Sequence, residues 1–190
     1  VVPDKTVDVA SSNLSADSGI AENSTNNINS DSEIKQEPIT FSLAAIGDVM
    51  CHNTQYMDAY NSSTDSYDFS YVFEDIETYI QSADISIGSL ETTFAGKDRG
   101  YSNYPTFNSP EQLAYDLSEM GLDVLSTAGN HALDKGFSGL SNTLDVLDDA
   151  NISHSGTYRT QEDRDSVLIK DVNGVKVAIL SYTYGTNGIA

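Results

Sequence analysis

Short apolar runs alternate with amphipathic segments along the chain from about residue 41 onward. Buried strands are predicted at 41–46, 84–88 and 122–127, where mostly apolar residues are followed at once by polar ones. Apolar residues recur at helical spacing in four other segments: 54–60, 69–81, 110–120 and 136–150. Strands that alternate with helices predict a parallel sheet in an α/β sandwich, with the strand ends meeting along one edge.

The strongest turn signal lies late in the chain. Asn173 and Gly174 separate the strand-like segments 166–171 and 175–182, a pattern typical of a two-residue β-hairpin. A short strand is also predicted at 152–154. The sequence therefore adds a hairpin to the predicted parallel sheet.

Two of the helical segments carry more detailed signals. Ser109 followed by Pro110 predicts an N-cap and first helical position for the helix at 110–120. In the segment 69–81, apolar side chains at helical spacing are expected to face the core: Val72, Phe73, Ile76, Tyr79 and Ile80.

The first forty residues differ from the rest of the chain. Residues 1–40 are rich in Ser, Asn, Asp and Glu and contain no aromatic residue, so we predict a disordered tether there and one α/β domain at 41–190. Such a tether is expected between a membrane or lipid anchor and an extracytoplasmic domain, although an ordinary flexible terminus explains it almost as well.

The net charge limits the partners that the protein can bind, and the cysteine content limits the covalent and metal sites that it can form. The formal net charge of −20 argues against nucleic acid or an anionic membrane surface as a general partner, because both would be repelled. Cys51 is the single cysteine, which excludes an intrachain disulfide and a thiolate metal cluster. No apolar run approaches the roughly 20 residues of a membrane-spanning helix.

Polar side chains follow three of the predicted strands where each strand ends. Asp48 follows the first strand, Glu91 the second, and Asn130 and His131 the third. Ligands collect at the carboxyl ends of strands in open α/β sheets, so we expect these side chains to share a site. Carboxylate and amide oxygens suit divalent cations, and an imidazole suits proton transfer. Taken singly, each also has a plain alternative as a helix cap, turn former or surface residue.

Four segments resemble the bacterial capsule-synthesis CapA family, also called the poly-γ-glutamate capsule biosynthesis proteins. They are Gly-Asp-Val-Met at 47–50, the strand and its end at 83–91, Ala-Gly-Asn-His-Ala-Leu-Asp at 128–134, and the stretch at 181–188. The resemblance extends from about residue 41 to the end of the chain. The family usually has Asn where this chain has Ser89 and Gly129.

The resemblance implies the fold of the calcineurin-like metallophosphoesterases, an αββα sandwich with two divalent metal ions on strand-end loops. By that resemblance Asp48 would bind the first metal, Glu91 would replace the bridging carboxylate, and Asn130 would bind the second metal. His131 would be the catalytic group near the leaving oxygen. Further candidates at the site are His52, Ser89 and Asp134.

The histidines leave such a metal site incomplete. Metallophosphoesterases have Asp-x-His in the first motif, but position 50 is Met here, and the remaining metal-binding histidines come from the second half of that fold. His154, after a short strand, is expected to make a structural hydrogen bond. We therefore expect the chain to match the N-terminal half of the fold, with the second half absent, disordered or supplied by another chain. An exposed apolar edge would favour self-association.

Three functions remain open at this stage. The first is an extracytoplasmic protein, at the cell surface or membrane-anchored, that works with membrane-bound machinery in the synthesis or export of poly-γ-glutamate or another anionic capsule polymer. The second is a metal-dependent hydrolase acting on a phosphate ester or on the polymer's amide bonds. The third is a non-catalytic structural or polymer-binding module.

Overall fold

Four parallel strands form the central sheet. The structure is a computed structural model that describes residues 37–188. Its sheet has the order β1 (Leu43–Val49), β4 (Ile85–Leu90), β5 (Val124–Ser126) and β6 (Ser153–Ser155), all parallel. The α/β class predicted from the sequence is confirmed. The predicted tether at 1–40 lies almost entirely outside the described residues.

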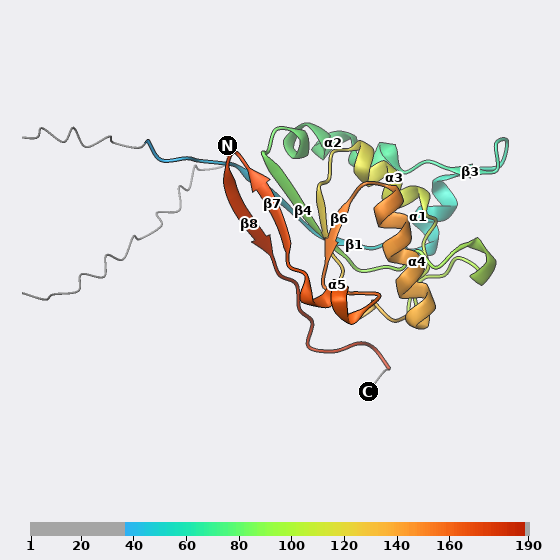
Figure 1. Ribbon diagram of the computed structural model, residues 1–190. Coiled ribbons are helices and arrows are strands. Elements are labelled where there is room, and N and C mark those ends of the chain that lie inside the picture. The colour runs from blue at the N-terminus through green and yellow to red at the C-terminus, as the bar shows by residue number, and fades with distance from the viewer. Residues whose placement is uncertain (1–36, 189–190) are drawn as a thin grey trace, which may run out of the picture. The chain divides into compact units, whose positions relative to one another are not determined.

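Helices cover one face of this sheet (Figure 1). The helices between the sheet strands are α1 (Asn53–Asp58), α2 (Ser70–Gln81), α3 (Gln112–Glu119) and α4 (Gly136–Asp149). Leu117 of α3 and Leu147 of α4 are fully buried and belong to one apolar cluster with Leu90 and Leu125 of the sheet. This burial of branched aliphatic side chains fixes the helices on the face that β4 and β5 present to them.

A hairpin lies on the opposite face. It consists of β7 (Leu168–Val172) and β8 (Val175–Ile179), paired antiparallel, and Figure 1 shows it across the sheet from α4. Its Val172 and Ile179 form a second buried cluster with Ile85 and Val124. The turn residues Asn173 and Gly174 have φ of 54° and 85°, as the Asn-Gly signal predicts.

Several boundaries differ from the sequence prediction. Strand β1 does not end before Gly47 but runs to Val49, with an irregular register between Ala45 and Asp48. Ser109 is not the cap of α3, which begins at Gln112; its hydroxyl instead lies 2.7 Å from that of Thr92 in the interior. Four short elements carried no clear periodicity and were not predicted: β2 (Tyr60–Asn61), β3 (Ser66–Tyr67), the 3-10 helix η1 (Lys97–Arg99) and α5 (Gln161–Asp165).

An apolar surface surrounds the edge strand β1. Leu43 is 49% exposed, and of the five side chains predicted to face the core from α2 only Ile80 is buried. Val72 and Ile76 of α2 instead line a hollow of about 290 Å³ between that helix and β1. The core prediction for α2 was therefore wrong for most of its stripe, because helical periodicity shows which residues share a face and not whether that face is covered. None of the helices within residues 37–188 is long and apolar enough to cross a membrane.

Candidate functional site

The first two candidate residues are brought together by strand register. Asp48 pairs with Ser89 across β1 and β4, and the Glu91 amide donates to the carbonyl of Val49 at 2.9 Å. This pairing sets the carboxyl groups of Asp48 and Glu91 side by side, close enough for a hydrogen bond when one is protonated. Two adjacent carboxylates at a strand edge can hold a hard divalent cation.

The pKa of Glu91 reflects this crowding. Its burial raises the pKa above the usual value, and the neighbouring charge of Asp48 raises it further, against a smaller lowering by His131. Glu91 is thus a carboxylate whose negative charge is poorly compensated. A bound cation would supply the missing compensation.

His131 lies beside this pair and is itself buried. Its Nδ1 lies 2.7 Å from Oδ2 of Asp134, and because a carboxylate only accepts, Nδ1 carries the hydrogen. Nε2 then faces the site, 3.9 Å from Oε1 of Glu91. A carboxylate that fixes one ring nitrogen orients the other toward the site, which is the arrangement of a general acid or base.

Phe107 and Asp134 hold this imidazole from two sides. Oδ2 of Asp134 also accepts from the amide of Phe107 at 2.7 Å, and the Phe107 ring contacts His131 edge-on with centroids 4.7 Å apart. The ring of His52 meets the same Phe107 ring at 5.3 Å, so His52 approaches the site through an aromatic contact. Burial raises the pKa of the Cys51 thiol to about 11, which makes it a poor nucleophile.

Asn187 belongs to the site and was not among the candidate residues. Its backbone amide donates to the carbonyl of Asn130 at 2.8 Å, and its side-chain Nδ2 lies 3.3 Å from Nε2 of His131. Because Nδ2 only donates, Nε2 of His131, the ring nitrogen that faces the site, accepts this hydrogen bond. Asn187 lies in the stretch at 181–188, which resembles the family, and this resemblance was the sequence signal that could have marked it as a site residue.

Of the other residues considered from the sequence, Asn130 and Ser89 lie next to the site residues and His154 does not. Asn130 is exposed beside His131, and Ser89 is half-buried between Asp48 and Ser126 in the strand register. His154 lies apart from them and makes a 3.0 Å hydrogen bond to Asp148, in agreement with the structural role predicted for it.

The donor set fits a divalent cation held by oxygen atoms. Within residues 37–188 no group of three or more His, Cys, Asp and Glu side chains is arranged as a metal centre. The adjacent carboxyls of Asp48 and Glu91, and the exposed amide of Asn130 next to His131 in the chain, are oxygen donors of the kind that hard cations such as Mg²⁺, Ca²⁺ or Mn²⁺ prefer. A cation that keeps several water ligands suits such a small donor set.

Replacing Glu91 with Gln is expected to change how stability depends on pH. Because the folded protein raises the pKa of Glu91, this group stabilises the fold below its ordinary pKa and loses that contribution as pH rises through the raised value. In chelator, Glu91→Gln should therefore melt above wild type at pH 7 and lose that advantage at pH 4. Asp75→Asn, at an exposed position of α2, serves as the control. Parallel melting profiles for Glu91→Gln and wild type would contradict the raised pKa of Glu91.

Comparison with known proteins identifies the family of the chain. The family model described as "Bacterial capsule synthesis protein PGA_cap" matches residues 42–190, which include every strand and every candidate residue. The chain belongs to this family. The capsule-synthesis assignment made from the four sequence segments is confirmed.

Curated relatives are similar to this chain at low identity. The capsule biosynthesis protein CapA of Bacillus anthracis is 26% identical over 78% of this chain, and the match covers 36% of that protein. The PGA biosynthesis protein CapA of Bacillus subtilis is 24% identical over 75% of the chain, covering 37% of that protein. An uncharacterized protein of Sinorhizobium fredii, y4sH, is 25% identical over 74% of the chain, covering 30% of that protein. The chain thus spans about a third of the length of these relatives.

Proposed function

We propose that the chain works in the synthesis or export of an anionic capsule polymer such as poly-γ-glutamate, at the outer side of the cell envelope. Membership of the PGA_cap family carries this proposal, and two of the curated relatives are named for capsule or PGA biosynthesis. Membrane-bound synthesis machinery is the expected partner. The exposed Leu43 side of β1 offers a surface for association with that machinery or with a second copy.

Electrostatics sets the condition for polymer binding. A polyanion is repelled by a protein of net charge −20 unless positive charge lies between them. Lys97 pairs with Asp65 at 3.5 Å, which compensates its charge, and the guanidinium of Arg99 is oriented by the Lys135 carbonyl and the Ser138 hydroxyl, so η1 leaves a single uncompensated positive charge. A divalent cation at Asp48 and Glu91 is the better bridge. When bound there it supplies positive charge that a polymer carboxylate can share.

Binding of poly-γ-glutamate is therefore expected to depend on divalent cations. With Mg²⁺, Ca²⁺ or Mn²⁺ present, the affinity measured by calorimetry should exceed that in chelator by about tenfold or more, because a lost charge-assisted contact costs about 1.5–3 kcal/mol. Asp48→Asn and Glu91→Gln should each remove most of the cation effect, whereas Asp75→Asn should preserve it. Polymer binding that chelator leaves unchanged would refute the bridging role.

A second candidate function is a metal-dependent hydrolase, supported by His131. Its Nδ1 is fixed by Asp134 and its Nε2 faces Glu91, so the ring can protonate a leaving oxygen or nitrogen of a substrate bound beside the carboxylates. Incubating the same preparation with a phosphate ester and with the polymer separates the functions. Cation-dependent binding without turnover supports a non-catalytic module, and turnover that requires Glu91 supports the hydrolase.

A further inference from the structure

A hollow lies at the carboxyl ends of β5 and β6, on the sheet edge that carries the candidate site. Its volume is about 330 Å³, within the range of small-molecule sites. Ala128, after β5, and Gly156, after β6, line it. The rest of its lining comes from the loop after β6, from α5 and from the segment after β8: Tyr158, Arg164, Ser181, Tyr182 and Thr183. Ligands of open α/β sheets bind outside the carboxyl ends of the strands, which is where this hollow lies.

The charge of this hollow is positive. Among the described residues that line it, Arg164 is the one with a charged side chain. Helix α5 also carries Glu162, Asp163 and Asp165, but none of these three lines the hollow. The carboxylates of Asp163 and Asp165 instead accept hydrogen bonds from groups at the start of the same helix. The guanidinium of Arg164 is therefore left without a carboxylate partner on its own helix.

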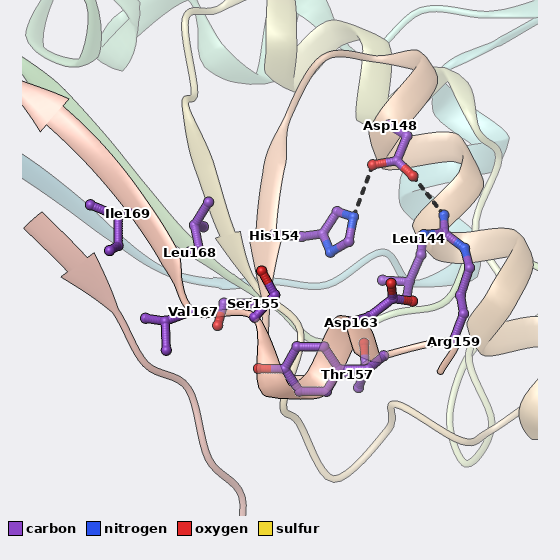
Figure 2. Close-up of a pocket in the computed structure, with 12 residues that line it drawn as sticks. Leu144, Asp148, His154, Ser155, Thr157, Arg159, Asp163, Val167, Leu168 and Ile169 are labelled. Carbon is purple, nitrogen blue, oxygen red and sulfur yellow. Dashed lines mark hydrogen bonds and ion pairs between the residues drawn. The ribbon is translucent and has the colours of Figure 1, made fainter. Parts of the chain in front are cut away.

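The neighbouring arginine shows what a compensated guanidinium looks like in this protein. Figure 2 shows Arg159 paired with Asp148 in an adjacent hollow, and Asp145 is its second partner at 2.8 Å. Within residues 37–188, Arg164 has no ion pair or side-chain hydrogen bond, whereas every other Lys and Arg side chain in that range has one. In a protein of net charge −20, such an unpaired guanidinium is available to an anionic ligand.

The lining favours a carboxylate that is attached to a short carbon chain. A guanidinium can donate two parallel hydrogen bonds to one carboxylate, and its single charge balances that of a carboxylate but not the nearly double charge of a phosphate monoester. The rings of Tyr158 and Tyr182 offer apolar surface for methylene groups, and Tyr182 is 84% exposed. Each residue of a γ-linked glutamate chain carries one carboxylate and two methylene groups, which matches this lining.

The position of the hollow lets one polymer chain reach two contacts. In the strand order β1-β4-β5-β6, Asp48 and Glu91 lie at the ends of the first two strands and the hollow lies at the ends of the last two. Adjacent strands are about 5 Å apart, so the ends of β4 and β6 are about 10 Å apart. A short stretch of an extended polymer spans this distance.

We propose that this hollow binds one carboxylate-bearing residue of the anionic polymer. Arg164 donates to the carboxylate, and the rings of Tyr158 and Tyr182 pack against the methylene groups. The inference rests on the proposed function and adds a second contact, which holds the polymer without help from the cation. The cation at Asp48 and Glu91 then binds another carboxylate of the same polymer chain.

Calorimetry with a short γ-linked glutamate oligomer, in Mg²⁺ and in chelator, tests this contact on the full chain. Arg164→Gln should weaken binding about tenfold or more in both conditions, because a charge-assisted contact is lost. The ratio between the two affinities, which measures the cation effect, should stay that of wild type. Because Arg164 is exposed, the variant is expected to fold normally.

Two further variants separate the guanidinium from charge in general. Arg164→Lys keeps the positive charge but cannot donate two parallel hydrogen bonds, so its affinity should lie between those of wild type and Arg164→Gln. Lys176→Gln removes an equal charge on β8 and should bind as wild type. Equal losses in Lys176→Gln and Arg164→Gln would overturn the proposal, because they would show only a general effect of net charge.

The remaining outcomes separate this proposal from the proposed function. If the oligomer binds with a cation effect and Arg164→Gln binds as tightly as wild type, the contact in the hollow is overturned and the proposed function stands. If wild type binds no oligomer in either condition, both are overturned. Tighter binding of glycerol phosphate than of the oligomer, lost in Arg164→Gln, would overturn the choice of a carboxylate and identify a phosphate as the ligand.

Discussion

Replacing Gly156 with Ala is expected to lower the free energy of unfolding by about 4 kcal/mol, the sum of overpacking and backbone strain. Gly156 follows β6 with φ of +121°, a conformation that L side chains rarely adopt. An added Cβ would lie 2.6 Å from both the Cβ and the backbone N of Ala128 and 2.7 Å from Oγ of Ser181. The first two atoms belong to the chain leading into the His131 loop and cannot rotate away. Urea denaturation followed by circular dichroism measures the loss.

Substitutions at two other glycines separate the effect of overpacking from that of backbone strain. Gly174 has φ of +85° but no described atom within 4 Å of an added Cβ, so Gly174→Ala should cost only strain, about 1 kcal/mol. Gly185 has open space within the described residues and no positive φ, so Gly185→Ala should leave stability unchanged. A Gly156→Ala protein as stable as Gly174→Ala would show that the contact with Ala128 is not close.

The sequence predicts β1, β4 and β5 well because each lies in a short apolar run with an abrupt polar end. The hairpin followed from Asn173 and Gly174, which need positive φ and have it. The small hairpin β2–β3 was missed because Tyr60–Asn61 and Ser66–Tyr67 are too short for any period to appear. Exposure of the α2 stripe was also unpredictable, since it depends on which element covers that helix.

The site was less predictable than the sheet. The sequence correctly predicted that Asp48, Glu91 and His131 lie at one edge of the sheet, because parallel strands in register place their ends together. Asn187 was not among the candidates because it lies 56 residues after His131. Its contacts with Asn130 and His131 depend on how the segment after β8 folds back, which no local pattern shows. The hydrogen-bond partner of His154 was not predictable either, because Asp148 lies on a helix face that periodicity marks only as polar.

Replacing Asp134 with Ala is expected to cost about 2–5 kcal/mol of stability and to release the His131 ring. The Asp134 side chain is 2% exposed, and one oxygen, Oδ2, accepts from both the Phe107 amide and Nδ1 of His131 at 2.7 Å. Its removal leaves two buried donors unpaired, each costing about 1–3 kcal/mol. Chemical denaturation gives the stability, and imidazole NMR gives the state of His131. The exposed Asp149→Ala should match wild type.

Asp134→Asn tells the structural part of this role from the electrostatic part. An amide oxygen placed where Oδ2 lies can accept both hydrogen bonds, so stability should fall by only about 1 kcal/mol, the difference between charged and neutral acceptors. The charge that stabilises a protonated His131 is nevertheless lost. If the site is a hydrolase, turnover by Asp134→Asn should fall about 100-fold with an unchanged Michaelis constant, since proton transfer contributes about that much. If Asp134→Ala and Asp134→Asn lose equal amounts of stability and of turnover, Asp134 acts in folding alone. In that case the imidazole of His131 needs only packing from residue 134 and not its negative charge.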